Sequence, residues 1–447
     1  MLGAGLAGLT LADALVQRGR EAVVLEKLSQ VGGLARTVRR DGFAFDLGGH
    51  RFHSAQTPPI AWLKRLMGEE LLTVPRKSCI LYEGRFISYP LQLRDALAHF
   101  GLARSVRAGF SYFRGRLGSS RAWAARSFEN KIISRFGREL YKAYFQPYTE
   151  KVWGIPCDRL SAEWADERIA IPSLAQAVAR SFSKNGAAKS RSGTQFLYPA
   201  RGAGSVCERL AERISASGRG RIALDVSSVE LTTGERGAEV RFASADRPER
   251  LPCERVVSTI PIHALACALG SQAEQDAASK LAYRDLVCVL LTLKRPSMTQ
   301  YSWIYTPDRG IVFGRLHEPG NWSRALVPAD EVCSVCAEVF CSAGDSVWQM
   351  ADGELAAQVV AHLAATGLVR REEIDRCYVE RAAGAYPVYE CGYERALGEF
   401  NTLISARPRL HLLGRTGSFR YLNMDAVIAE ALAMAEQIGG WESRSSE

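Results

Sequence analysis

Short apolar runs of strand length alternate with amphipathic helical runs at both ends of the chain, while the middle has a different pattern. Near the N-terminus, the helical run LTLADALVQRG is followed by the strand-like run EAVVLEK. From about residue 92 to about residue 182, apolar residues recur every three or four positions, as in SFENKIISRFGRELYKAYF, and this spacing predicts helices. The pattern therefore indicates a discontinuous α/β protein with a helical insert.

Beyond about residue 275, the apolar runs have strand length and predict an antiparallel sheet. These runs are LVCVLLTLK, YSWIY, IVFGRL and CSVCAEVF. Residues 352–367, DGELAAQVVAHLAATG, have the acidic start and the glycine end of a helix. Residues 184–193, KNGAAKSRSG, are rich in Gly, Ser and Lys and predict a linker or loop.

A dinucleotide-binding motif opens the chain. Gly3, Gly5 and Gly8 form G-x-G-x-x-G, which is followed by a helix and by a strand that ends at Glu26. In such a motif the first glycine permits a tight turn, the second lets backbone amides approach a pyrophosphate, and the third allows the helix to pack closely on the strand. The carboxylate of Glu26 would accept hydrogen bonds from ribose hydroxyls, which favours FAD or NAD over NADP. The alternative is an ordinary glycine-rich turn.

The first strand of this motif is short, because only Met1 and Leu2 precede Gly3. We expect that the chain begins inside that strand; a genuine start with a weakened first strand is the alternative. In both cases the chain is expected to hold its cofactor less well than one extended by a few apolar residues.

The composition is that of a globular protein, with 47% hydrophobic and 23% charged residues among 447. No apolar stretch approaches the roughly 20 residues of a membrane-spanning helix, and no signal segment is apparent, so a cytoplasmic protein is expected.

The net charge of +9 is concentrated in two tracts: six arginines and no acid lie between Asp95 and Glu129, and residues 168–207 also lack acids. Such tracts attract a phosphorylated substrate or a membrane surface, or form a solvated helix face. Nucleic acid is not an expected partner, because no recognition motif is present.

The eleven cysteines are scattered along the chain, which favours reduced thiols over a disulfide framework. Cys333 and Cys336 form C-x-x-C within a strand-like run, where residues three apart point to opposite faces. Two core thiols are therefore favoured over a redox or metal pair, and no metal site is predicted.

A second glycine-rich segment follows the strand that ends at Glu26: Gly32, Gly33 and Arg36 form G-G-x-x-R. This segment resembles one in the amine oxidase and protoporphyrinogen oxidase superfamily of flavoproteins, where it runs along the FAD diphosphate and ribityl chain. The resemblance is strongest to the UDP-galactopyranose mutase-like branch and extends over nearly the whole chain. The matching segments are GGHRFH at 48–53, YKAYFQPYTEKVWG at 141–154, FLYPARGAGS at 196–205, VFGRLHE at 312–318, AYPVYE at 385–390 and GRTGSFRYLNMDAVIAEAL at 414–432.

The resemblance implies an FAD-binding site and a substrate site. The implied FAD contacts are Gly3, Gly5, Leu6, Ala7, Gly8, Glu26, Lys27, Gly33, Leu34, Ala35, Arg36, Gly48, Gly49, His50, Val226, Gly414, Arg415, Asn423, Met424 and Asp425. The implied catalytic residues are His50, Arg51, His53 and Arg315, and the implied substrate contacts are Trp153, Arg315, Tyr386 and Tyr421. The plainer alternatives are structural histidines, a strand-edge Arg315 and a Trp153 that belongs to the core.

The expected fold is α/β, with a Rossmann-like FAD-binding domain of GR2/PHBH type, a helical insert and an antiparallel-sheet substrate domain. The FAD-binding domain is expected to comprise residues 1–75, 194–270 and 378–447. The helical domain is expected at 90–190, and the substrate sheet at 76–89 and 271–377.

Two chemistries are compatible with these residues. The favoured one is an FAD-dependent oxidoreductase that transfers hydride between flavin N5 and a polar small molecule, such as an anionic compound, a phosphorylated or other sugar derivative, or an amine. The alternative is a redox-neutral nucleotide-sugar mutase in which reduced flavin N5 acts as the nucleophile. The mutase pattern is incomplete, because Pro172 or Ser173 stands where mutases carry a further arginine and Gly49 stands where they have proline. A flavin-free binding protein of this fold would lack the flavin-facing motifs. The oligomeric state is not predicted.

Overall fold

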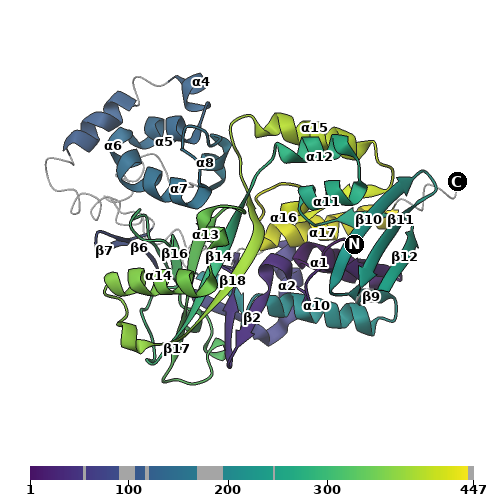
Figure 1. Ribbon diagram of the computed structural model, residues 1–447, viewed down its shortest axis with the longest axis horizontal. Helices are drawn as coiled ribbons and strands as arrows, with labels where there is room; N and C mark the ends of the chain where they lie inside the picture. Colours follow the sequence, from purple (N-terminus) through teal and green to yellow (C-terminus); the bar gives the residue numbers. More distant parts are fainter. Residues whose placement is uncertain (54–56, 90–105, 116–119, 169–194, 245–246, 441–447) are drawn as a thin grey trace.

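A computed structural model of the chain describes residues 1–53, 57–89, 106–115, 120–168, 195–244 and 247–440. Three regions are visible (Figure 1): a unit that contains both ends of the described chain, a large mixed sheet, and a helical lobe beside that sheet. The predicted linker at 184–193 and the positions Pro172 and Ser173 lie outside the described residues.

A parallel sheet is the centre of the first unit. Two parallel pairs form it, β1 (Ala22–Leu25) with β9 (Gly220–Ala223) and β13 (Val256–Ser258) with β19 (Leu410–Leu412). Leu2 bridges Leu25 on one side and Ser258 on the other, both in parallel orientation, so it joins the two pairs into one sheet. The short N-terminal segment therefore occupies the central strand position.

Layers cover both faces of this parallel sheet. Helix α1 (Leu6–Val16) is buried along its whole length, as its apolar composition on all sides predicts. It packs against α10 (Gly204–Ala216) and α17 (Met424–Gly440), and buried Asp13 of α1 pairs with Arg213 at 2.9 Å. The elements of the other layer are β10 (Val226–Gly234), β11 (Gly237–Ser244), β12 (Arg247–Cys253), α11 (Ile262–Leu269), α12 (Gln272–Ser279) and α15 (Tyr393–Ser405).

The large sheet has seven strands in the described part of the chain, in the order β18-β14-β17-β16-β15-β6-β7. Its central strands are buried on both faces, which explains their unbroken apolar sequences. Helix α14 (Asp352–Ala365) lies against β14 and β18. The strand bounds are β6 (Ser78–Tyr82), β7 (Arg85–Ser88), β14 (Tyr283–Leu293), β15 (Trp303–Tyr305), β16 (Arg315–His317), β17 (Cys333–Cys341) and β18 (Ile374–Pro387).

Two expectations about this sheet need correction. It is mixed rather than antiparallel, because β15 and β6 pair in parallel. The expected boundary at residue 378 falls inside β18, which continues the sheet to Pro387 through its pairing with β14. In the first unit, β9 and β10 are separated at Asp225, whose φ of 54° is incompatible with one continuous strand.

The helical lobe contains residues 106–115 and several short helices. The predicted helix over SFENKIISRFGRELYKAYF is interrupted at Gly137, whose φ is 81°, and a π-helical turn, η3 (Tyr141–Phe145), follows. Lys151 ties the lobe to the sheet, because its Nζ donates to the carbonyls of Thr306 and Ile311, both at 2.8 Å. The lobe's other elements are α4 (Arg121–Ala124), α5 (Phe128–Phe136), α6 (Arg138–Leu140), α7 (Gln146–Trp153) and α8 (Glu163–Arg168).

Smaller elements connect the three regions. The hairpin of β2 and β3 packs on the large sheet, and the small sheet β4-β8-β5 contributes side chains both to the core around α1 and to a cluster that contains Trp303 of β15. Their bounds are β2 (Thr37–Arg40), β3 (Phe43–Asp46), β4 (Phe52–His53), β5 (Leu71–Pro75) and β8 (Gln195–Pro199). The remaining short elements are η1 (Gly33–Ala35), α2 (Pro58–Met67), η2 (Gly68–Glu70), η5 (Pro319–Asn321), η6 (Arg324–Leu326), α13 (Ser346–Gln349), η7 (Arg371–Glu373) and α16 (Gly414–Gly417).

The eleven cysteines all fall within the described residues and are free thiols. Cys333 and Cys336 belong to different hydrophobic clusters, which confirms that they point to opposite faces of β17. Among the helices that the structure describes, none combines the length and apolarity needed to cross a bilayer.

The packing of α1 on the sheet generates a prediction for two glycines. A Cβ at Gly8 would lie 2.2 Å from the carbonyl oxygen of Gly3, so Gly8→Ala must displace α1 and is expected to lower the free energy of unfolding by about 3 kcal/mol. Gly398 is the matched control, since it lies inside α15, is exposed, and would place a Cβ within 4 Å of no described heavy atom beyond its chain neighbours and the nearby backbone of its own helix. Gly398→Ala should raise stability by about 1 kcal/mol. Chemical denaturation of both variants tests this, and equal effects would contradict it.

Candidate functional site

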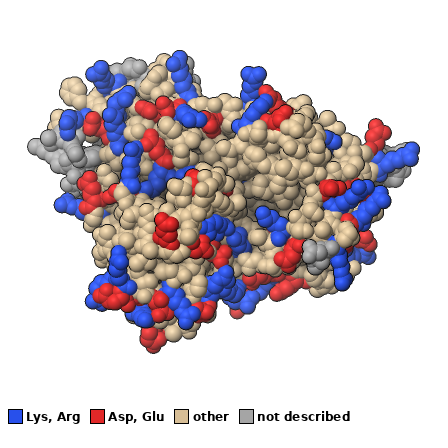
Figure 2. Space-filling model, in the orientation of Figure 1, with Lys and Arg blue, Asp and Glu red and all other residues tan. Residues whose placement is uncertain are grey.

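A large cavity follows the carboxyl edge of the parallel sheet and has a volume of about 760 Å³. It is called the dinucleotide cavity below. Figure 2 shows a hollow near the middle of this face of the molecule. The lining of the dinucleotide cavity includes the predicted residues Gly3, Gly5, Leu6, Ala7, Glu26, Lys27, Gly33, Leu34, Ala35, Arg36, His50, Val226, Gly414, Arg415 and Met424.

The N-terminus of α1 opens into the dinucleotide cavity. No described side chain caps it, its first turn contains no acid, and its first helical hydrogen bond is donated by Leu9 to the carbonyl of Gly5, at 3.0 Å. The amides of Leu6 and Ala7 therefore have no helical carbonyl to bind. Amides in this position, together with the helix dipole, form a binding site for an anion such as a pyrophosphate.

Glu26 lies at the end of β1 and is nearly buried. Its carboxylate accepts hydrogen bonds from the amides of Ala4 at 2.8 Å and Leu28 at 3.0 Å, and these bonds fix its orientation. Each carboxylate oxygen has a second lone pair, so the group can also accept a ribose hydroxyl from the cavity.

Two arginines are held beside the dinucleotide cavity by backbone carbonyls. The guanidinium of Arg36 donates to the carbonyl of Gly33 at 3.0 Å, and burial lowers the pKa of Arg36. The guanidinium of Arg415 donates to the carbonyl of Leu422 at 2.9 and 2.6 Å and lies over the ring of Tyr421 at 4.7 Å. Both guanidiniums belong to the lining of the dinucleotide cavity, where a cationic group suits an anionic or electron-rich cofactor.

His50 lies in the dinucleotide cavity, near both Arg415 and Arg315. Burial, reinforced by these two cations, lowers the pKa of His50 to about 3, so the imidazole is neutral at physiological pH. Its Nδ1 is buried and has no hydrogen-bond partner among the described residues. An unsatisfied ring nitrogen, a helix N-terminus without a cap and a ribose-facing carboxylate in one cavity fit the hydrogen-bonding groups of FAD.

A second cavity of about 200 Å³ lies where the helical lobe meets the large sheet. It is called the aromatic cavity below. Among the described residues that line it, Arg315 is the only charged one, and five are tyrosines: Tyr89, Tyr144, Tyr148, Tyr305 and Tyr386. Trp153 also lines it and is buried against Trp164, with ring centroids 4.3 Å apart.

Arg315 is paired with a carboxylate that the sequence analysis did not select. Glu338 is fully buried on β17, directly opposite Arg315 on β16, and their ion pair has two hydrogen bonds, one of 2.6 Å from Nε. His317 Nδ1 lies 3.3 Å from the same carboxylate. Burial alone would raise the pKa of Glu338, but Arg315 lowers it to about 2. The sequence did contain a feature that could have identified Glu338, because it is the single charged residue of the apolar run CSVCAEVF.

The Arg315–Glu338 pair lies directly behind the loop that carries His50. A Cβ at Gly48 would be 3.2 Å from Glu338 Oε2, and a Cβ at Gly49 would be 3.9 Å from Arg315 Cζ. The glycines of this loop therefore allow the chain to approach the ion pair closely, and the pair connects the two cavities.

Strand β18 also contributes to both cavities. Arg381, Ala382 and Ala383 line the dinucleotide cavity, whereas Tyr386 lines the aromatic cavity. The register with β14 shifts between these positions, which is a β-bulge. Asp285 holds the bulge, since its carboxylate accepts a hydrogen bond from the amide of Gly384 at 2.6 Å. Tyr421 stacks on Tyr386 at 5.9 Å without lining either cavity.

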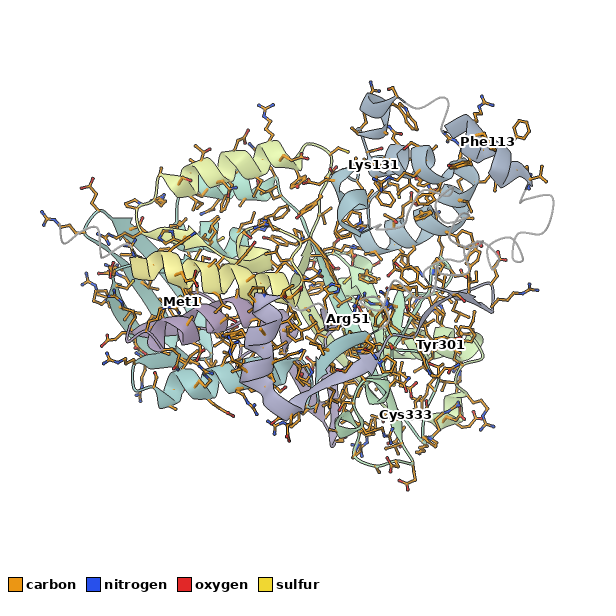
Figure 3. The ribbon with its side chains drawn as sticks, turned by 180° about the vertical axis from the view of Figure 1, so that it is seen from behind. Met1, Arg51, Phe113, Lys131, Tyr301 and Cys333 are labelled. Carbon is orange, nitrogen blue, oxygen red and sulfur yellow. The ribbon has the colours of Figure 1, made fainter. Side chains whose placement is uncertain are left out.

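Several predicted site residues lie elsewhere. His53 is exposed on β4, because alternation along that strand buries Phe52 instead. Arg51 lies over the ring of Trp303 at 4.9 Å, near the centre of the molecule in Figure 3, and lines neither cavity. Asn423 is exposed. Gly8, Gly48, Gly49 and Asp425 are also outside the lining of the dinucleotide cavity.

Metal ligands do not cluster in the part of the chain that the structure describes: it contains no group of three or more His, Cys, Asp or Glu that could hold an ion.

The sequence matches the family described as flavin containing amine oxidoreductase over residues 6–438. Over 165 residues, 36% of this chain, it is 24% identical to a probable UDP-galactopyranose mutase of Klebsiella pneumoniae, of which the match covers 42%. Over 82 residues, 18% of this chain, it is 32% identical to a possible lysine-specific histone demethylase 1 of Drosophila melanogaster, of which the match covers 9%. The chain thus spans less than half of either relative's length.

Solved structures share the fold over nearly the whole chain. Reduced UDP-galactopyranose mutase has a TM-score of 0.81 and 21% identity, with 98% of this chain and 95% of that chain covered. A putative protoporphyrinogen oxidase from Exiguobacterium sp. 255-15 has a TM-score of 0.73 and 18% identity, with 98% and 97% covered. Putrescine oxidase with bound putrescine has a TM-score of 0.65 and 18% identity, with the same coverage.

The low pKa of His50 predicts a pH dependence of stability. Below the ordinary histidine pKa of about 6.5, the unfolded chain binds a proton that the folded protein excludes until about pH 3. The contribution of neutral His50 to the free energy of unfolding is therefore fully present above about pH 6.5 and is lost as the pH falls toward about 3. In the flavin-free protein, the free energy of unfolding should fall below pH 6.5 by up to about 1.4 kcal/mol per pH unit more than in His50→Gln. His53→Gln, in the same loop but exposed, should behave like the wild type; identical slopes for all three proteins would refute this.

The buried ion pair predicts an asymmetric response to substitution. Glu338→Gln leaves Arg315 buried without a counter-charge and should lower the free energy of unfolding by about 3–5 kcal/mol. Glu380→Gln removes a more exposed partner of Arg40 and should cost less than about 1 kcal/mol. Replacing both buried partners, as in Arg315→Met with Glu338→Leu, should recover most of the loss. Denaturant titration measures all three, and a Glu338→Gln cost no larger than that of Glu380→Gln would exclude a buried pair.

Proposed function

The chain belongs to the family of flavin containing amine oxidoreductases, and from this premise we propose that it oxidises a polar, hydroxyl-bearing substrate that carries at most one negative charge. It is an FAD-dependent enzyme. When bound, the flavin supplies a hydride acceptor at its N5 position. We propose that FAD lies along α1 in the manner of GR2/PHBH-type domains, with its pyrophosphate at the amides of Leu6 and Ala7.

The composition of the aromatic cavity is the observation that carries the substrate class. Tyrosine side chains can both donate and accept hydrogen bonds through their hydroxyls, as sugar-type hydroxyls do, so a lining with five tyrosines suits a substrate with several hydroxyl groups. The one charged lining residue, Arg315, is already neutralised by Glu338. A substrate with two or more negative charges would meet too little positive charge among the described residues.

Arg315 is the residue that would orient this substrate. Its Nε donates to Glu338 and its Nη2 donates to Glu338 and to the Tyr386 hydroxyl, so the guanidinium is fixed in place. The two N–H groups of Nη1 are not used in these bonds and suit a hydroxyl or a single carboxylate. His50, neutral at physiological pH, would orient the cofactor through its ring nitrogens rather than act as a base.

A nucleotide-sugar mutase is the second candidate. The likeness to reduced UDP-galactopyranose mutase, at a TM-score of 0.81, favours it, as does the stacked pair of Tyr386 and Tyr421 beside Arg415. The compensated charge of Arg315 weighs against it, because a departing diphosphate must be held by net positive charge.

Flavin bleaching under anaerobic conditions tests the proposal. The oxidised protein is mixed with a panel of polyols, sugar alcohols, uronic acids and amines, and we expect bleaching by a hydroxyl compound of low charge. Tyr386→Phe should lower kcat/KM for that compound about tenfold while flavin content stays the same. Tyr378→Phe, the same change on the same strand but outside both cavities, should leave kcat/KM unchanged.

Two outcomes would overturn the proposal. Ring isomerisation of a UDP-sugar by the chemically reduced protein, with no net consumption of reductant, would establish the mutase instead. Bleaching by amines alone would mean that the substrate is an amine and not a hydroxyl compound.

A further inference from the structure

An exposed apolar face is present on the helix of residues 106–115 in the helical lobe. Val106 is 60% exposed, Phe110 80% and Phe113 64%, whereas Ala108 and Tyr112 are buried. At 3.6 residues per turn, the three exposed residues fall within about 60° of arc, on the side of the helix opposite the buried pair. Figure 3 shows Phe113 at the outer edge of the lobe, pointing away from the rest of the molecule.

This helix is firmly attached to the lobe by its buried side. A Cβ at Gly137 would lie 2.6 Å from the amide nitrogen of Tyr112, and one at Gly115 would lie 2.7 Å from the carbonyl of Ile133, so the backbones are in close contact. The hydroxyl of Ser111 accepts a hydrogen bond from the amide of Arg138 at 2.8 Å and so caps α6. The apolar face is therefore presented in a fixed orientation.

Positive charge borders the apolar face. Arg107 and Arg114 are both exposed and project from one side of it, at about 80–100° around the helix axis from Val106. The sequence from Asp95 to Glu129 contains no acid between these two residues, so no carboxylate of this segment offsets the arginines. Figure 2 shows Lys and Arg side chains projecting from the outer edge of the lobe.

We propose that the helix of residues 106–115 docks this enzyme on the surface of an anionic lipid bilayer. Phenylalanine rings on one face with arginines beside them are the arrangement of a helix that lies in the plane of a membrane interface. Val106, Phe110 and Phe113 enter the acyl boundary, and Arg107 and Arg114 bind lipid phosphates. A second copy of the chain is a poorer occupant, because it would bring the same arginines to the contact. Nucleic acid offers phosphates but leaves the rings in water.

The proposal does not depend on the substrate. Residues of the same lobe, among them Phe128 and Trp153, line the aromatic cavity, so docking would hold that cavity at a constant distance from the membrane. Contact is reversible, since one short helix buries few side chains.

Co-sedimentation of the full, FAD-loaded protein with vesicles tests the proposal. We expect binding to vesicles of phosphatidylcholine with phosphatidylglycerol, at least about tenfold weaker binding to phosphatidylcholine alone, and release by high salt. Phe110→Ser with Phe113→Ser should lower the partition coefficient at least about tenfold. Phe86→Ser is the matched control, because Phe86 is also exposed but packs on Tyr301, which lies well away from Phe113 in Figure 3.

The arginines have their own matched variants. Arg107→Glu with Arg114→Glu should reduce binding to anionic vesicles about tenfold or more, while Arg395→Glu, at an exposed position on α15, should not. All variants should retain wild-type flavin absorbance and melting temperature, since the changed side chains are exposed. No binding to anionic vesicles, equal loss in Phe86→Ser, or binding to duplex DNA in place of vesicles would each overturn the proposal. Failure here leaves the substrate proposal intact.

Discussion

The structure is organised around the backbone amides at the start of α1, which point into a cavity and have no helical carbonyl to bind. Leu2 occupies the centre of the parallel sheet, so the helix that follows begins at the middle of the sheet's carboxyl edge. The helix can approach that edge only because Gly8 brings no side chain against the Gly3 carbonyl. An anion satisfies these amides best, and Glu26 and the glycine pair Gly32–Gly33 are arranged along the same cavity.

In the proposed substrate site, the organising group is a buried carboxylate. Glu338 fixes the guanidinium of Arg315 in the aromatic cavity, and the loop of Gly48 and Gly49 packs against the same pair. The net charge that a substrate meets in the aromatic cavity is therefore that of the Arg315–Glu338 pair and not that of Arg315 alone. An enzyme of this family that lacked the carboxylate would present a full positive charge at this position, and this difference would separate singly charged from multiply charged substrates.

Local sequence was sufficient for the parts of the site that depend on backbone geometry. Residues of the G-x-G-x-x-G turn, which was predicted from its spacing, line the same cavity as residues of the G-G-x-x-R segment and the Gly414–Arg415 turn, which the resemblance implied. Each of these segments combines a glycine with a neighbouring helix or strand. Strand faces and pairings were not available from sequence. Whether Phe52 or His53 pointed inward depended on which face β8 covered, and the partner of Arg315 depended on the register of β16 with β17. The boundary inside β18 was missed for the same reason, since only pairing with β14 assigns that strand to the large sheet.

The bulge in β18 has a thermodynamic consequence. Residues on one side of it touch the dinucleotide cavity, Tyr386 on the other side touches the aromatic cavity, and Asp285 holds the segment between them. A ligand that orders this segment from one cavity lowers the conformational entropy that the segment must still lose when a ligand binds in the other cavity. Cofactor and substrate affinities are then coupled, and the coupling is reciprocal: the factor by which FAD tightens the substrate is the factor by which the substrate tightens FAD.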